Sequence, residues 1–246
     1  MLVGSASVDD LLHDLTTATI DAFSTDDVEL GAVACLQVVA EMRKRSREAL
    51  LPPSLHPTIP PAMSLQVWDV GASPWGAFTM VMCRVSCRSG VRARGFTTAA
   101  FVSTEAACGE LRRQFGFPAR VADVSLRRGY DRVTATVTFE GNVIAQVEAI
   151  DPEPMANDDV QYTGILNLAH TPNGARLVQV EPHHHATRVE RLRAALTSFD
   201  GAAWGSALLE PAFVVSSSLA LESVEIPAIR FVCKPDELAF TGTEAV

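Results

Sequence analysis

Lysine is scarce in this sequence. Only Lys44 and Lys234 occur among 246 residues, so nearly all of the positive charge is arginine. The net charge of −9 is spread along the chain without a charged block, which argues against binding to a nucleic-acid phosphate backbone. No run approaches the ~18 apolar residues of a membrane helix. The N-terminus has neither the basic start nor the apolar stretch of a signal peptide. We therefore expect a cytoplasmic protein without nucleic-acid or membrane partners.

Several chemical signatures are also absent. The five cysteines are an odd number, and without an export signal they favour reduced thiols packed in the core. The sequence has no phosphate-binding loop and no dinucleotide fingerprint. These absences argue against a nucleotide-dependent activity, and we expect no cofactor.

The first fifth of the chain has helical and ambiguous patterns. Apolar residues recur at helical spacing over 8–23, and Ser7 can cap that helix. The apolar run 31–42 fits either a strand or a helix. Residues 43–51 are typical of a short polar-faced helix, which Pro52–Pro53 would end because proline cannot donate a helix hydrogen bond.

β-strand patterns dominate the rest of the chain. The clearest is a hairpin over 133–150, where apolar residues alternate with threonine and Glu140–Gly141–Asn142 forms the turn. One helix is predicted over about 104–115, capped by Ser103 or Thr104. Many strands with few helices predict a mainly β fold (α+β), a barrel or curled sheet with a few peripheral helices. We expect one domain over 1–246, with 1–30 as a divergent N-terminal helical extension.

Three segments resemble one known family in order and spacing. Residues 101–120, FVSTEAACGELRRQFGFPAR, are similar to a stretch in which a strand, a helix and an aromatic-Pro-Lys-Lys turn follow one another. Residues 73–87 and 213–227 are similar to its glycine-aromatic segment and its triple-serine strand. The chain thus resembles the acetoacetate decarboxylase-like superfamily over about 33–235. The resemblance implies a closed β-barrel with a buried apolar pocket, and a self-assembled oligomer.

The residues that carry the family's chemistry are replaced. The family uses a lysine that forms a Schiff base with a ketone, and its amine must be neutral at working pH. That position is Ala119 here, and the adjacent lysine position is Arg120, which cannot deprotonate. The family's acidic pocket residue falls at Met80, and an arginine of its first strand falls near Val33. Lys44, on the predicted 43–51 helix, and Lys234, beyond the last predicted strand, cannot substitute.

The resemblance also indicates candidate site residues. We expect Arg120 to be catalytic, gripping a carboxylate or enol oxygen, although a structural pair with Glu105, Asp123 or another acid would also explain it. Of Thr79 and Met80, strand alternation lets only one face the pocket. The remaining predicted substrate-binding residues are Trp75, Phe117 and Ala119, and Trp75 also fits a buried scaffold position.

Two further clusters are explained better by structural roles than by metal binding or catalysis. Glu181, His183 and His185 alternate along one apparent strand and could bind a divalent metal if a fourth group joined them. A solvated histidine cluster explains them better, and we expect no metal. The serines at 216–218 lack the glycines of a nucleophile elbow, so they fit backbone hydrogen bonding better than catalysis.

Two classes of function follow from this pattern. The first is a tailoring enzyme of natural-product biosynthesis that forms no imine. It would cyclise, dehydrate or cleave an apolar keto or polyketide substrate held in near-attack geometry. The second is a catalytically inactive ligand-binding or scaffold protein of the same fold. In neither case is the chain a classical acetoacetate decarboxylase.

Overall fold

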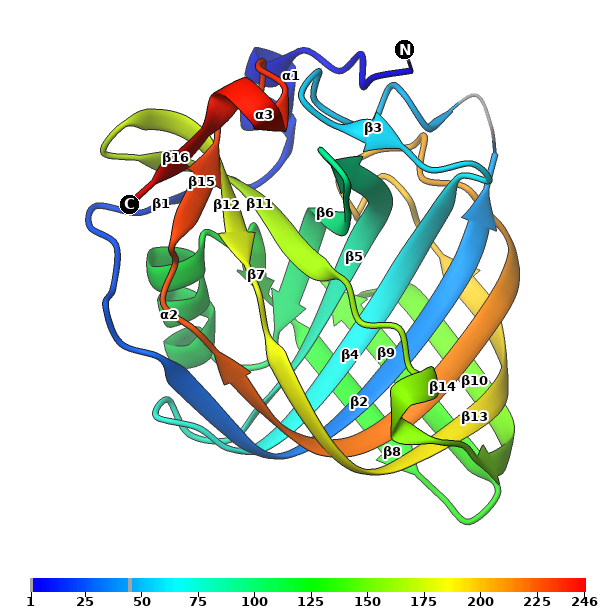
Figure 1. The fold of residues 1–246 in the computed structure, drawn as a ribbon. Coiled ribbons are helices and arrows are strands. Elements are labelled where there is room, and N and C mark those ends of the chain that lie inside the picture. Colours follow the sequence, from blue (N-terminus) through cyan, green and yellow to red (C-terminus); the bar gives the residue numbers. More distant parts are fainter. Residues whose placement is uncertain (1, 44–45) are drawn as a thin grey trace.

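One long curled sheet dominates the molecule (Figure 1). The computed structural model describes residues 2–43 and 46–246. The helical elements are α1 (Val8–Asp14), α2 (Glu105–Phe115), the 3-10 turn η2 (Asn157–Asp159) and α3 (Ala239–Gly242). The strands are β1 (Ala18–Thr19), β2 (Val28–Met42), β3 (His56–Pro57), β4 (Ala62–Ala72), β5 (Phe78–Ser89), β6 (Arg92–Val102), β7 (Ala119–Val121), β8 (Asp123–Arg128), β9 (Arg132–Phe139), β10 (Asn142–Pro154), β11 (Gly164–Thr171), β12 (Gly174–Val180), β13 (His183–Phe199), β14 (Pro211–Ile226), β15 (Phe231–Cys233) and β16 (Thr243–Ala245).

The hydrogen-bonded strands follow a single path. Its order is β16-β15-β12-β11-β6-β5-β4-β2-β14-β13-β10-β9-β8. Three short strands lie off this path and pair with members of it: β1 with β11, β3 with β5 and β7 with β6. The sheet curls so that β8 to β10 lie behind β4 to β6 (Figure 1). Within residues 2–43 and 46–246, no ladder joins β8 to β16. The mainly β fold is therefore confirmed, whereas closure of the barrel is not.

Two apolar cores lie on opposite faces of this sheet. Strand alternation places Val81 and Val85 of β5 in a core shared with β8, β9 and β10, which we call the inner core. Met80 and Met82 of the same strand face the other side, in a second core that includes Phe115 of α2. We call this second cluster the α2 core.

The N-terminal predictions need correction. The helix expected over 8–23 ends at Asp14, although Ser7 caps it as predicted by accepting a hydrogen bond from the Asp10 N–H. The threonine-rich residues 16–19 favour extended backbone, and Ala18–Thr19 pair in parallel with β11. The ambiguous run 31–42 is a strand.

The predicted helix over 43–51 is wrong for its described part. Residues 47–50 form turns, and the Leu51 N–H donates to the Glu48 carbonyl at 3.3 Å. Lys44 and Arg45 lie outside the described residues.

The other local predictions are confirmed. Helix α2 occupies 105–115, and Thr104, one of the two expected caps, accepts from the Ala107 N–H. The hairpin expected over 133–150 is β9 and β10, turning through Glu140 and Gly141 with positive φ at both. None of the described helices is long and apolar enough to cross a membrane.

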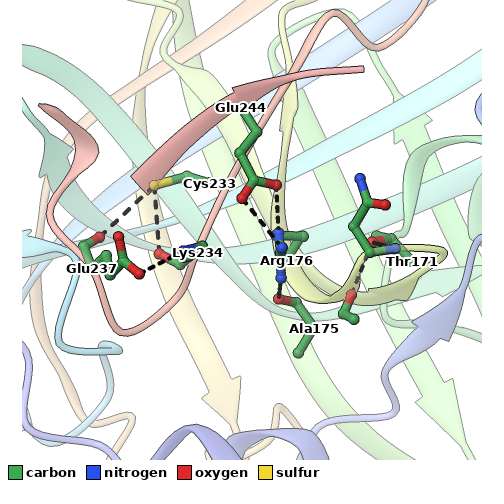
Figure 2. A network of polar contacts seen from close by, with 9 residues as sticks. Thr171, Ala175, Arg176, Cys233, Lys234, Glu237 and Glu244 are labelled. Carbon is green, nitrogen blue, oxygen red and sulfur yellow. Dashed lines mark hydrogen bonds and ion pairs between the residues drawn. The ribbon is translucent and has the colours of Figure 1, made fainter. Parts of the chain in front are cut away.

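The C-terminal segment fixes the position of Lys234. Strand β15 pairs with β12, and α3 and β16 follow Lys234 in the chain, so β15 is not the last strand as expected. Figure 2 shows Lys234 Nζ bonded to Glu237 Oε1 at 2.6 Å. This bond raises the pKa of the lysine amine. The amine stays protonated at neutral pH, which suits an ion pair and not a Schiff-base nucleophile.

Candidate functional site

The positions expected to carry the family's charged groups meet in the α2 core. Ala119 lies on β7 opposite Ala100 of β6. Met80 lies on β5 and Val33 on β2, and all three are at most 2 % exposed. They belong to one apolar cluster. The structure thus brings together the lysine, acid and arginine positions inferred from the sequence, and each of them is apolar.

The other predicted substrate-binding residues divide between two faces. Phe117 is buried in the α2 core, and Trp75 packs at its edge with its ring 6.0 Å from that of Phe78. Thr79 points the opposite way from Met80 and donates a hydrogen bond to Asp69 Oδ1 at 2.9 Å. Met80 is thus the member of that pair that faces the cluster.

Arg120 lies on the inner-core side of β7, away from Ala119. Its guanidinium carbon is 4.6 Å from the ring centroids of both Phe101 and Phe139. One of its amino groups donates to the Ala203 carbonyl at 2.5 Å. Partial burial lowers the pKa of Arg120. Neither suggested acidic partner, Glu105 or Asp123, forms an ion pair with it in the described chain. A catalytic role for Arg120 stays a prediction.

The face that carries Ala119 becomes polar three strands further on, at Gln66 of β4. Residues paired across adjacent strands point to the same face of a sheet. From Ala119, that row runs through Ala100, Met82, Gln66, Gln37 and Ser218. A single face therefore has an apolar end beside α2 and a polar end on β2, β4 and β14.

A loop covers the polar end. The segment that links β10 to β11 crosses in front of the sheet (Figure 1), and its residues 161–163 are bonded to the strands. Gln37 Nε2 donates to the first carbonyl of this triplet at 3.2 Å. Arg84 donates to the third at 3.1 Å. The two bonds hold the loop against β2 and β5.

The middle residue of the triplet joins a buried acid–histidine pair. Tyr162 donates to Glu222 Oε2 at 2.9 Å and stacks on the His184 ring, with centroids 3.6 Å apart. His184 Nδ1 lies 2.9 Å from Glu222 Oε1. The Glu222 side chain is fully buried, and that of His184 is 7 % exposed. Burial, followed by the charges of Cys35 and Glu222, raises the pKa of Tyr162, so its hydroxyl keeps the proton it donates.

The geometry sets the roles of the two imidazole nitrogens. An ionised carboxylate only accepts hydrogen bonds, so the Nδ1 that faces Glu222 carries the hydrogen. Nε2 is then the ring nitrogen that faces away from the carboxylate. Within the described chain, Nε2 has no hydrogen-bond partner. This is the orientation that a carboxylate imposes on a histidine general base.

The histidine cluster noted in the sequence has a different arrangement from a metal site. His183 and His185 alternate along β13, but Glu181 precedes this strand and pairs with Arg94, and His183 is exposed beside Glu225. No group of three potential metal ligands occurs among residues 2–43 and 46–246. The buried histidine is His184, which lies between His183 and His185. The alternating pattern of Glu181, His183 and His185 does not include it.

A cavity of about 400 Å³ opens beside the loop. Polar side chains from β2, β4, β5, β13 and β14 line it, including Gln37, Ser64 and Arg84, together with the serines 216–218. Met155 and Val160 of the covering loop add apolar surface. A volume of this size suits a small organic molecule. The triple-serine segment thus lies at a cavity, although Ser217 itself donates to the Leu192 carbonyl at 2.7 Å.

Comparison with known proteins establishes the family. The model of the acetoacetate decarboxylase family matches residues 16–234, and the chain belongs to this family. No curated protein matches the chain. The fold of the acetoacetate decarboxylase of Legionella pneumophila is similar, with a TM-score of 0.75 at 17% identity, covering 85% of this chain and 88% of that one.

Two other solved structures share the fold. The enduracididine biosynthesis enzyme MppR, complexed with pyruvate, gives a TM-score of 0.69 at 14% identity, over 82% of this chain and 89% of that one. An acetoacetate decarboxylase-like enzyme from Sphingomonas wittichii RW1 gives 0.64 at 13% identity, over 84% and 92%. The fold is therefore shared by a biosynthetic enzyme as well as by decarboxylases.

Proposed function

We propose that this chain is a biosynthetic enzyme of the acetoacetate decarboxylase family that works without a Schiff base. Its substrate would be an apolar keto or polyketide-like molecule, and its reaction a cyclisation, a dehydration or a lyase step. The observation that carries the proposal is the His184–Glu222 pair, buried on the same sheet face as the apolar positions Ala119 and Met80.

The proposed chemistry begins with a proton transfer. Nε2 of His184 removes a proton from the carbon beside the ketone, and the C–H electron pair becomes an enolate. In a dehydration, the enolate expels a β-hydroxyl group, which takes the same proton and leaves as water. In a cyclisation, the enolate carbon bonds to a second carbonyl carbon, whose oxygen takes the proton. Glu222 holds the ring and stabilises its protonated form, as in other carboxylate–histidine pairs.

Deuterium exchange tests this chemistry without knowledge of the natural substrate. The probe is 4-phenyl-2-butanone in D₂O, followed by proton NMR at the carbons beside the ketone. We expect the protein to speed exchange above the buffer rate. His184→Gln should slow this about 100-fold, the loss typical of a missing general base. His183→Gln, on the exposed side of the strand, is the matched control and should match the wild type.

Two outcomes separate the classes of function. Exchange at the buffer rate would overturn the proposal that the chain is an enzyme. It would favour the inactive ligand-binding or scaffold protein, an alternative that is also consistent with the filled apolar core around Ala119. Borohydride treatment during exchange should leave the protein mass unchanged, because no lysine forms an imine. A covalent adduct would contradict the mechanism.

We also propose a cytoplasmic homo-oligomer for this enzyme. Phe213 and Val215 on β14 are 57% and 52% exposed and suit a subunit contact. Analytical ultracentrifugation of the wild type and of Phe213→Ser tests this assembly, since a smaller species should appear in the variant.

A further inference from the structure

Arg84 is buried without an acidic partner. It lies on β5, is 2 % exposed and lines the cavity beside the covering loop. Its one hydrogen bond goes to the Thr163 carbonyl. Its Nε has no partner, and no carboxylate of the described chain forms an ion pair with it. Arginine is seldom fully buried without such a pair, because the desolvated charge is costly.

The strands around Arg84 are shaped to admit its side chain. Gly95 lies on the neighbouring strand, and a Cβ there would stand 3.0 Å from Arg84 Cδ and 3.3 Å from Nε. Burial lowers the pKa of the guanidinium to about 10. The group is therefore still charged at neutral pH, within a site that leaves the charge uncompensated.

Further unpaired polar atoms lie on the same face. Gln66 Oε1 and Trp68 Nε1 on β4 are buried and have no hydrogen-bond partner among residues 2–43 and 46–246. Buried polar groups are nearly always bonded, so each such atom calls for a ligand or a water. Their position on the strand beside Arg84 places a group of unsatisfied polar atoms between the cavity and the His184–Glu222 pair.

We infer that Arg84 is an anion anchor and that the cavity binds a small organic carboxylate. Two guanidinium nitrogens can grip a carboxylate in parallel, which a neutral amide cannot match. Met155 and Val160 contact the apolar body of the ligand. The other arginine of the cavity, Arg191, is exposed and already paired with Glu153. The anchor is independent of proton transfer at His184, so carboxylate binding and exchange activity can fail separately.

The test uses a matched pair of probes, 3-phenylpropanoate and 3-phenylpropanamide, which have nearly the same shape and differ in charge. Isothermal titration calorimetry at neutral pH measures both. We expect the carboxylate to bind wild type at least tenfold tighter than the amide. Arg84→Met should abolish this preference, and Arg191→Met, the control, should keep it. Equal affinities in the wild type, or a preference lost with Arg191→Met and kept with Arg84→Met, would overturn the anchor.

A second variant protects the test against misfolding. Circular dichroism melting checks that Arg84→Met folds. Val39→Phe keeps Arg84 and fills the cavity from β2, where Val39 is a lining residue. This variant should lose binding of 3-phenylpropanoate by at least tenfold. Unchanged binding in Val39→Phe would place the carboxylate elsewhere and overturn the inference.

Discussion

The two ends of one sheet face differ in what they bury. Beside α2, the face carries Ala119 and Met80 in a closed apolar cluster. On β2, β4 and β5 it carries Gln37, Gln66 and Arg84, under a loop and beside a cavity. The register joins the two ends strand by strand. One end of the face thus buries only apolar side chains, whereas the other end buries polar ones.

The contrast follows from the cost of isolated charges. One charged residue left in the α2 core would lack partners and destabilise the fold. The polar end solves the same problem differently, because Glu222 has both His184 and Tyr162 as partners. Arg84 is the exception, and the proposed carboxylate would supply what it lacks.

The largest expected loss of stability comes from removing the acid at the polar end of the face. Glu222→Ala leaves His184 and the Tyr162 hydroxyl without their shared acceptor, and we expect a loss of about 3–5 kcal/mol in the free energy of unfolding. Glu225→Ala removes the acid of the exposed pair with His183 and should cost under about 1 kcal/mol. Urea unfolding measures both. Similar losses would mean that the buried pair is no stronger than a surface contact.

The next largest loss of stability is expected when a substitution restores a charge at the apolar end of the face. Ala119→Lys forces a long amine into a filled core, and we expect a loss of roughly 2–4 kcal/mol from overpacking and desolvation. Val121→Lys, on the same strand but 44% exposed, should change stability by less than about 0.5 kcal/mol. The thermal midpoints compare the two. A tolerated lysine at 119 would show that the cluster still has room for the family's nucleophile.

A smaller loss of stability is expected at Arg120, which lies on the inner-core face and not on the face that carries His184. Arg120→Met removes the charge between the Phe101 and Phe139 rings, which should cost about 1–2 kcal/mol. Because the proposed proton transfer uses His184 and not Arg120, exchange of 4-phenyl-2-butanone should be unchanged per folded molecule, in contrast to the catalytic role predicted for Arg120 from the sequence. Arg127→Met on the exposed side of β8 serves as the stability control. Loss of exchange in Arg120→Met would return the catalytic role to this residue.

The smallest effect is expected at the cysteines. All five are free and buried, and burial raises the pKa values of Cys83 and Cys87 to about 12. Their thiolate fraction at pH 8 is then about one in ten thousand. A colorimetric thiol reagent should react with the folded protein far more slowly than with the denatured chain. Rapid reaction of the native protein would show that a thiol is accessible.

The sequence predicts the sheet and α2 well because these depend on local patterns. The threonines of β9 alternate with apolar residues, and Thr104 stands where a cap is needed. The candidate site was harder to predict from the sequence, since Arg84, His184 and Glu222 come from three strands that only the register brings together. Alternation did place His183 and His185 on one side of β13, but it could not tell that this side was the exposed one.

The most direct measurement is a crystal structure of the wild type with 3-phenylpropanoate. We predict the carboxylate within hydrogen-bonding distance of Arg84, with the phenyl ring against Met155 and Val160 under the covering loop. Electron density for the ligand beside Ala119 and Met80 would contradict the account, because the apolar end would then be the binding pocket.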